Sequence, residues 1–211
     1  MSDTVLTLVR HGETEWNAAG RIQGHLDIPL NDAGLAQAAA IGERLGGHAF
    51  DAILSSDLER ALQTARLIVR HSEQTLVRDA RLRERHLGVL QGLTGEEAAM
   101  REPQAWQAFK TRNPEAALEG GETLVKFSQR VVRLLDELVR THSGRRLLLV
   151  THGGVLDAAY RHATAMPLNA PRDFPIYNAS INVLRHRAGA WTVESWGEVS
   201  HLPQELAMDD T

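Results

Sequence analysis

The stretch VLTLVRHG, at residues 5–12, decides the fold of this chain. Its first five residues form a short apolar run rich in β-forming side chains, which predicts a strand buried in a parallel sheet. A second and more hydrophobic run, LLLV at residues 147–150, is followed by Thr151-His152-Gly153-Gly154. The sequence therefore predicts two buried strands, each of which ends close to a histidine and a glycine.

Helical and strand patterns alternate along the rest of the chain. The other expected strands are residues 50–54, 75–77, 180–185 and 190–195, and the expected helices are about residues 32–45, 57–71, 94–112, 123–140 and 153–162. Ser56 and Glu59 have the spacing of a capping box at the start of the second helix. The alternation predicts an α/β fold, a three-layer α/β/α sandwich with a mostly parallel central sheet. The last two strands, joined at residues 187–189, should add an antiparallel C-terminal edge.

The length and charge of the chain limit its organisation and its partners. A chain of 211 residues suits one compact domain, so we expect residues 1–211 to form a single domain with a helical insertion at about residues 93–121. The 23 Lys and Arg against 27 Asp and Glu give a net charge of −4, which argues against a dedicated nucleic-acid binder.

The sequence also lacks the features of several classes of protein. It has no cysteine, which excludes disulfides and thiolate chemistry. The start, Met1-Ser2-Asp3-Thr4, is unlike a signal peptide, and no apolar run approaches the roughly 20 residues that span a bilayer. The ten histidines include no His-Glu-x-x-His motif. We expect a cytoplasmic protein with no membrane contact, no metal and no cofactor.

Polar side chains that follow three of the strands should meet in one crevice, because ligands of open α/β sheets bind beyond the carboxyl ends of the strands. Arg10 and His11 end the first strand, Arg60 lies in the first helical turn after the second, and His152 follows residues 147–150. Gly12 is expected to let the backbone leave the strand through its freedom in φ.

The helix that begins at Gly153 should offer free N–H groups, which favour an anion. Two arginines, two imidazoles and these backbone donors suit a phosphoryl group, whose charge is spread over three oxygens. A phosphorylated compound is therefore the expected ligand.

Four blocks of the sequence, in order, are similar to the signatures of the histidine phosphatase superfamily, also called phosphoglycerate mutase-like. They are LVRHGETEWN at residues 8–17, SSDLERALQTA at residues 55–65, RERHLG at residues 83–88 and VTHGG at residues 150–154. One block alone would be a weak match, whereas four in family order over most of the chain are a strong one.

The resemblance implies a role for each matching residue. His11 would be the nucleophile that forms a phosphohistidine, and Glu84 would be the general acid. The phosphoryl oxygens would be bound by Arg10, Arg60 and His152. Further substrate contacts would come from Asn17, Gln23, Gly24 and Gly153. Glu13, Glu15 and Glu102 are other carboxylates that compete with Glu84 for the role of the acid.

Members of the family differ in the molecule that accepts the phosphoryl group, which separates phosphatases from mutases. Residues 84–93 look close to the mutase version, which depends on 2,3-bisphosphoglycerate. Residues 20–30 and 120–123 resemble phosphatase members instead, and between residues 94 and 121 there is no recognisable Arg- and Pro-rich insertion of the mutase kind, only Lys110 and Arg112 as a basic pair. We therefore expect a metal-independent phosphomonoesterase, with the mutase as the alternative.

Two further functions stay open from the sequence. The chain could act on protein phosphohistidine or phosphotyrosine, or it could bind a phosphorylated ligand with weak activity. Candidate substrates are sugar phosphates, phosphoglycerates and nucleotide-pathway phosphoesters such as a ribazole phosphate. Both a monomer and a homodimer are compatible with the sequence.

Overall fold

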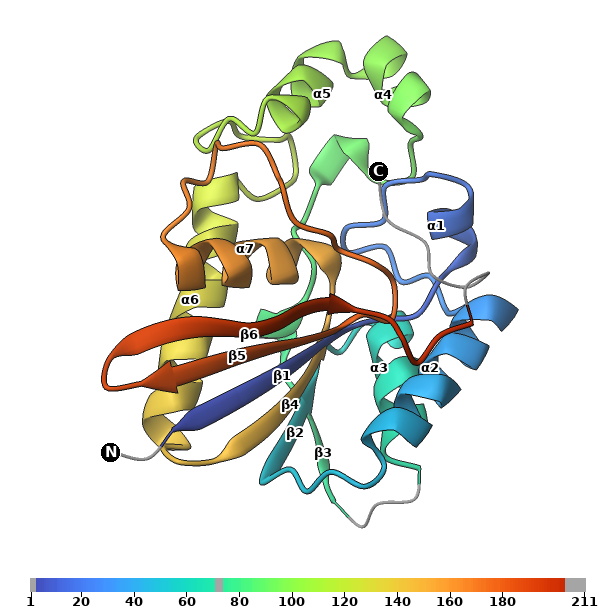
Figure 1. The fold of residues 1–211 in the computed structure, drawn as a ribbon. Helices are drawn as coiled ribbons and strands as arrows, with labels where there is room; N and C mark the ends of the chain where they lie inside the picture. Colours follow the sequence, from blue (N-terminus) through green and yellow to red (C-terminus); the bar gives the residue numbers. More distant parts are fainter. Residues whose placement is uncertain (1–2, 71–73, 204–211) are drawn as a thin grey trace.

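A six-stranded sheet forms the centre of the protein, in a computed structural model that describes residues 3–70 and 74–203 (Figure 1). Its strands are β1 (Thr4–Arg10), β2 (Ala52–Ser55), β3 (Leu76–Arg78), β4 (Arg146–Thr151), β5 (Ile181–Arg187) and β6 (Ala190–Glu198). Their order is β3-β2-β4-β1-β5-β6, in which β3, β2, β4 and β1 run parallel and β5 and β6 are antiparallel. The predicted mostly parallel sheet with an antiparallel C-terminal edge is confirmed.

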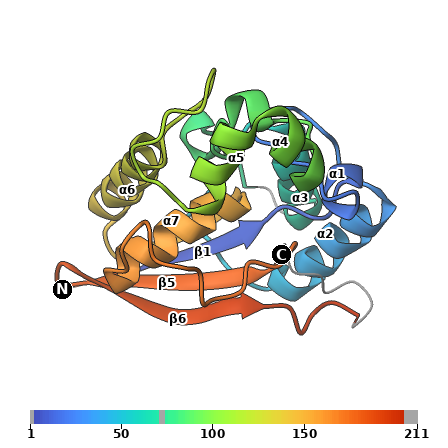
Figure 2. The ribbon, with the colours of Figure 1, turned by 90° about the horizontal axis from the view of Figure 1, so that it is seen from above.

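Successive side chains of the central strands pack into two different hydrophobic cores, one on each face of the sheet. Leu147 and Leu149 of β4 pack with α6 (Leu124–Thr141) and α7 (Gly153–Thr164) on one face. Leu148 and Val150 pack with α2 (Asp32–Leu45) and α3 (Glu59–Ile68) on the other face. Because neighbouring residues of a strand point to opposite faces, an unbroken apolar run can fill both cores. Figures 1 and 2 show the resulting helix–sheet–helix layers, which confirm the predicted sandwich.

Side-chain caps fix the starts of two helices, which lie within one residue of the expected starts at residues 32 and 123. Asn31 accepts a hydrogen bond from the backbone N–H of Gly34 at the start of α2, and Thr123 accepts one from Lys126 at the start of α6. Each cap satisfies an N–H group that has no partner within the helix. Both helices therefore begin where their capping residues stand in the sequence.

The start of α3 corrects the sequence interpretation. This helix begins at Glu59 with Leu58 as its N-cap residue and without a side-chain cap, so the expected capping box at Ser56 does not form. The hydroxyl of Ser56 bonds to a histidine ring instead. The helix ends at Ile68, and the expected end at His71 lies outside the described residues.

The segment at residues 93–121 holds two helices, α4 (Gly95–Arg101) and α5 (Pro103–Lys110), where the sequence predicts one. The break falls at Glu102, because a proline disfavours helical geometry in the residue before it. Both helices lie beyond the sheet at the end where the active-site candidates gather (Figure 1). That residues 1–211 form a single domain stays a prediction.

The described residues also form three short elements: α1 (Glu15–Ala18) and two 3₁₀ turns, η1 (Ala80–Leu82) and η2 (Gly88–Leu90). The loop between η1 and η2 carries Glu84. Among the described residues, no helix combines the length and the apolar character that crossing a membrane requires.

Candidate active site

The pairing of β1 with β4 places two histidines side by side. Arg10 lies opposite Thr151 in the parallel register, and the backbone N–H of His11 donates to the Thr151 carbonyl at 2.9 Å. The rings of His11 and His152 then meet edge to face, with their centroids 5.1 Å apart. Both side chains are buried. Two residues that are far apart in the sequence thus share one site because their strands end together.

Gly12 has a different role from the one that its position suggests. Its φ is not positive, so freedom in φ is not what this turn requires. A Cβ atom at this position would instead collide with the carbonyl oxygen of Gly34 near the start of α2. The backbone N–H of Gly12 donates to Thr64 of α3 at 3.1 Å. Glycine is needed here because three elements approach one another closely.

The surroundings of His11 leave its Nε2 atom unprotonated. Its Nδ1 lies 2.7 Å from the carbonyl oxygen of Gly12, which can only accept, so Nδ1 carries the proton and Nε2 keeps its lone pair. Burial lowers the pKa of His11 well below its usual value, and the positive charges of Arg60 and Arg10 lower it further. The imidazole is therefore neutral near pH 7, as a nucleophile must be.

His152 is oriented by a residue that the sequence pattern assigns to a helix cap. Its Nε2 lies 2.8 Å from the hydroxyl of Ser56, while its Nδ1 is buried and has no partner among the described residues. Burial lowers the pKa of this ring, with Arg60 and His11 as further causes. Ser56 directly follows β2, and that strand-end position is the signal that could have revealed its role.

The two arginines are held by backbone carbonyls. Arg10 donates to the Ile176 carbonyl at 2.6 Å. Arg60 donates to the carbonyls of Gly24 and Leu26 at 2.8 and 2.9 Å, and its Nε is buried without a partner among the described residues. Burial lowers the pKa of Arg60 to about 10, although the charge of Glu84 opposes the shift. Arg60 stays charged at neutral pH, and an incoming anion would offset the cost of burying it.

The side chain of Glu84 lies at the start of α7 and is hydrogen-bonded there. Its Oε2 accepts a hydrogen bond from the Gly154 N–H at 2.9 Å, and its Oε1 accepts one from the Arg85 N–H at 2.7 Å. The helix N-terminus expected to hold an anion thus holds the carboxylate of Glu84 in this structure. The competing Glu13 is buried and accepts from the Asn31 side chain at 2.7 Å, which ties it to α2.

The four expected substrate contacts differ in what they offer. The side-chain oxygen of Asn17 serves the capping box of α1, so only its NH₂ group is open to a ligand. Gln23 is buried, and its Oε1 has no partner among the described residues. Gly24 has a φ of +54°, and its carbonyl orients Arg60. A Cβ atom at Gly153 would lie 3.5 Å from the Nε of Arg10. Gln23 is thus the contact with the clearest unmet hydrogen bond.

Two further residues near the site are not identified by the sequence patterns. Asn178 donates to the His11 carbonyl at 3.1 Å and approaches the Asn17 oxygen at 3.5 Å. His25, which no motif separates from the structural histidines, has its Nε2 2.7 Å from the Glu84 carbonyl oxygen. Both contacts join segments far apart in the sequence, and a local sequence pattern cannot predict such contacts.

The positive charge of the site comes from its arginines. Within residues 3–70 and 74–203, no group of three or more histidine and carboxylate side chains could hold a metal ion. Two guanidinium groups and two imidazoles next to a carboxyl group can bind a phosphoryl dianion, attack it and protonate its leaving oxygen.

Comparison with known proteins agrees with this geometry. Residues 6–199 match the histidine phosphatase superfamily (branch 1). A metal-independent phosphoserine phosphatase of Arabidopsis thaliana is 45% identical over 204 residues, which cover 94% of this chain and 83% of that protein. A phosphoglycerate mutase-like protein of the same plant is 42% identical over 203 residues, 94% of this chain and 87% of that protein.

A solved structure shares the fold throughout. It is a phosphoserine phosphatase mutant of Entamoeba histolytica in complex with phosphoserine, 28% identical, with a TM-score of 0.85 over 95% of this chain and 100% of the other. The chain therefore belongs to the histidine phosphatase superfamily, branch 1, and is a phosphoric monoester hydrolase.

Proposed function

We propose that this protein is a metal-independent phosphomonoesterase that hydrolyses small phosphorylated metabolites through a phosphohistidine on His11. One observation carries the proposal: the neutral, buried ring of His11 lies beside His152, and the positive charges of Arg60 and Arg10 help to lower its pKa. Burying a charged guanidinium group is costly unless a partner compensates its charge, so two buried arginines beside a histidine indicate an anionic ligand.

The reaction has two displacements at phosphorus. The Nε2 lone pair of His11 attacks phosphorus while the bond from phosphorus to the ester oxygen breaks, and Glu84 gives a proton to that oxygen. Water then attacks phosphorus and loses a proton to Glu84 while the bond from phosphorus to Nε2 of His11 breaks. This step releases inorganic phosphate and returns the lone pair to His11. General acid–base help of this kind typically contributes about 10²–10⁴-fold, and the cations around the phosphoryl oxygens stabilise the transition state further.

The segment at residues 93–121 favours hydrolysis over the mutase reaction. Arg112, which with Lys110 forms the basic pair near the place where the mutase insertion would stand, forms an ion pair with Asp157 at 2.5 Å and donates to the Leu168 carbonyl. Lys110 lies 5.6 Å from the ring centre of Trp106 on the same helix. Since Arg112 is already engaged in structural contacts, it is poorly placed to hold the second phosphate of a bisphosphorylated intermediate.

The relatives suggest which esters to try first. One is named a phosphoserine phosphatase, and a structural neighbour holds phosphoserine. We propose that the substrate is a phosphorylated small acid of this kind, hydrolysed in the cytoplasm without a cofactor.

The experiment compares phosphate release with isomerisation. Purified protein is given phosphoserine, 3-phosphoglycerate, sugar phosphates and p-nitrophenyl phosphate, each in chelator, and 3-phosphoglycerate is also tested with 2,3-bisphosphoglycerate. We expect phosphate release from several esters at an unchanged rate in chelator. Bisphosphoglycerate-dependent formation of 2-phosphoglycerate with little phosphate release would make the protein a mutase, and activity restored only by Mg²⁺ or Zn²⁺ would refute the metal-free reaction.

A further inference from the structure

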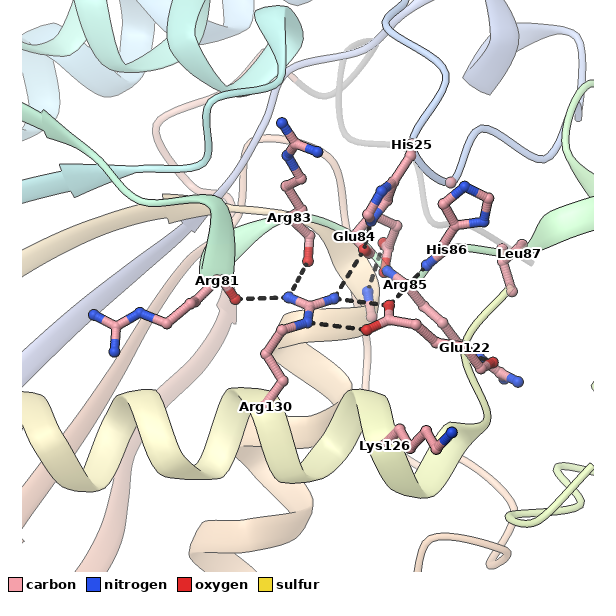
Figure 3. Close-up of polar contacts among 12 residues, drawn as sticks. His25, Arg81, Arg83, Glu84, Arg85, His86, Leu87, Glu122, Lys126 and Arg130 are labelled. Atoms are coloured by element: carbon pink, nitrogen blue, oxygen red, sulfur yellow. Dashed lines mark hydrogen bonds and ion pairs between the residues drawn. The ribbon is translucent and has the colours of Figure 1, made fainter. Parts of the chain in front are cut away.

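The guanidinium group of Arg130 lies directly beneath the loop that carries Glu84 (Figure 3). Arg130 projects from α6, and its Nη1 donates to the carbonyls of Arg81 at 2.7 Å and Arg83 at 3.0 Å. Its Nη2 donates to the carbonyl of Glu84 itself at 3.2 Å. One side chain thus holds three carbonyls from four consecutive residues.

The remaining donors of Arg130 meet Glu122. Nε and Nη2 of Arg130 donate to the two carboxylate oxygens of Glu122 at 3.1 and 2.9 Å. These bonds, with those to the three carbonyls, make five hydrogen bonds, which equals the number of N–H groups on a guanidinium. A lysine has a single nitrogen and cannot reproduce this pattern.

Glu122 also binds the backbone of the loop on the C-terminal side of Glu84. Its Oε2 also accepts from the His86 N–H at 3.0 Å, and its own N–H donates to the His86 carbonyl at 2.8 Å. Burial alone would raise the pKa of Glu122, but the hydrogen bonds from Arg130 and the His86 N–H outweigh it and keep the pKa below its usual value. Glu122 therefore stays ionised and keeps its hydrogen bonds to Arg130 and to the His86 N–H.

The loop lies outside the regular hydrogen-bonding of the sheet. Residues 83–87 stand between η1 and η2 and belong to no strand. From this backbone the Glu84 side chain reaches the Gly154 N–H on α7, so the place of its carboxyl group depends on the place of the loop. Without Arg130 the carbonyls of residues 81 and 83 would lose this side-chain donor, and that of Glu84 would depend on His25.

We propose that Arg130 is a positioning residue for the general acid: with Glu122 it clamps the loop at residues 81–86, so that the Glu84 carboxyl group meets the leaving oxygen of the substrate. Arg130 touches neither phosphate nor leaving group in this role. The inference rests on the proposed function, since it needs Glu84 to act as the acid.

The test compares two esters whose leaving groups differ in their need for a proton. The serine alkoxide of phosphoserine must be protonated as it leaves, whereas p-nitrophenolate leaves readily without a proton. Arg130→Met, Arg130→Lys and Glu84→Gln are assayed on both esters, with thermal unfolding measured for each variant. Arg133→Met is the matched control, because Arg133 lies three residues further along α6, is exposed and bonds to the nearby Gln129 side chain.

We expect Arg130→Met to lower kcat/KM on phosphoserine by about tenfold or more, part of the roughly 10²–10⁴-fold that a general acid supplies, and to change kcat/KM on p-nitrophenyl phosphate by less than about threefold. The comparison uses kcat/KM because this ratio covers the steps up to departure of the leaving group and not the later attack of water, in which Glu84 acts alike for both esters. Arg130→Lys should recover only part of the loss, and Arg133→Met should match the parent on both esters. An equal loss on both esters with Arg130→Met, while Glu84→Gln loses activity on phosphoserine alone, would overturn the role of Arg130. If Glu84→Gln lowers kcat/KM equally on both esters, the proposed acid is wrong and the inference falls with it.

Discussion

At the scale of single residues, burial controls the chemistry of the two site histidines. His11 and His152 are both buried, and burial together with the neighbouring arginines lowers the pKa of each. The same effect that keeps the His11 ring neutral links the stability of the fold to pH, because the unfolded chain does not share it.

Acidification should therefore destabilise the protein through these two rings. Each has a folded-state pKa below the unfolded value of 6.5, so the unfolded chain binds more protons as the pH falls. Their contribution is complete above pH 6.5 and is lost progressively below it. We expect the free energy of unfolding, measured with urea between about pH 8 and pH 5, to fall on acidification, and His152→Gln to make that fall shallower. An unchanged slope in the variant would contradict the buried neutral state.

Ser56 offers a second test at this scale. Ser56→Ala leaves the buried Nε2 of His152 without its partner, which should cost about 1–3 kcal/mol of stability and misorient the ring, with a clear loss of kcat/KM. The neighbouring Ser55→Ala is the control, because the Ser55 hydroxyl is also buried but donates to the Ser56 carbonyl rather than to a site histidine. Equal losses of kcat/KM in the two variants would show that the bond to His152 has no special role.

The residues that the sequence could identify share one property. His11, His152 and Arg60 stand at strand ends or in the helical turn that follows, so local patterns place them at one edge of the sheet. Ser56 also follows a strand end, but its pattern matches a helix cap, and its partner His152 lies 96 positions away. Arg130 follows no strand, and its partner, the carbonyl of Glu84, lies 46 positions away. Only the folded chain brings these partners together.

At the scale of elements, close backbone contact limits substitution where β1 leaves the sheet. Gly12→Ala would press a methyl group against the Gly34 carbonyl near the start of α2 and should cost about 1–3 kcal/mol, with a loss of activity because His11 precedes this turn. Gly47→Ala, where nothing lies within 4 Å, should change stability by no more than about 0.5 kcal/mol. Chemical denaturation of both variants checks the prediction, and a Gly12→Ala variant as stable as Gly47→Ala would contradict it.

Element boundaries can be predicted well where the helical pattern begins beside a cap and less well where tertiary contacts compete. The helices α2 and α6 begin within one residue of their expected starts, after the caps Asn31 and Thr123. Ser56 has the pattern of a cap for α3, but the hydrogen bond to His152 takes its hydroxyl and the helix starts at Glu59. A capping pattern beside a strand end is therefore ambiguous, because the same hydroxyl can serve the site.

At the scale of the whole molecule, the sandwich follows from apolar runs that alternate with amphipathic helices. Leu148 and Leu149 feed opposite cores, so both faces of the sheet must be covered by helices. The carboxyl ends of β1, β2 and β4 then open to one side, where α4 and α5 lie (Figure 1). The fold places the site, and the arginines and histidines at the strand ends decide its chemistry.

Direct capture of the phosphoenzyme tests the central claim. The protein is mixed with ³²P-labelled phosphoserine or a second hydrolysed ester, quenched in base within milliseconds and digested, and the labelled peptide is identified beside that from His11→Ala, with folding checked by thermal unfolding. We predict an alkali-stable, acid-labile label on His11 that forms and decays at the turnover rate, and no label and no turnover in the variant. Turnover without a labelled intermediate, or a His11→Ala variant within about tenfold of the parent rate, would contradict nucleophilic catalysis by His11.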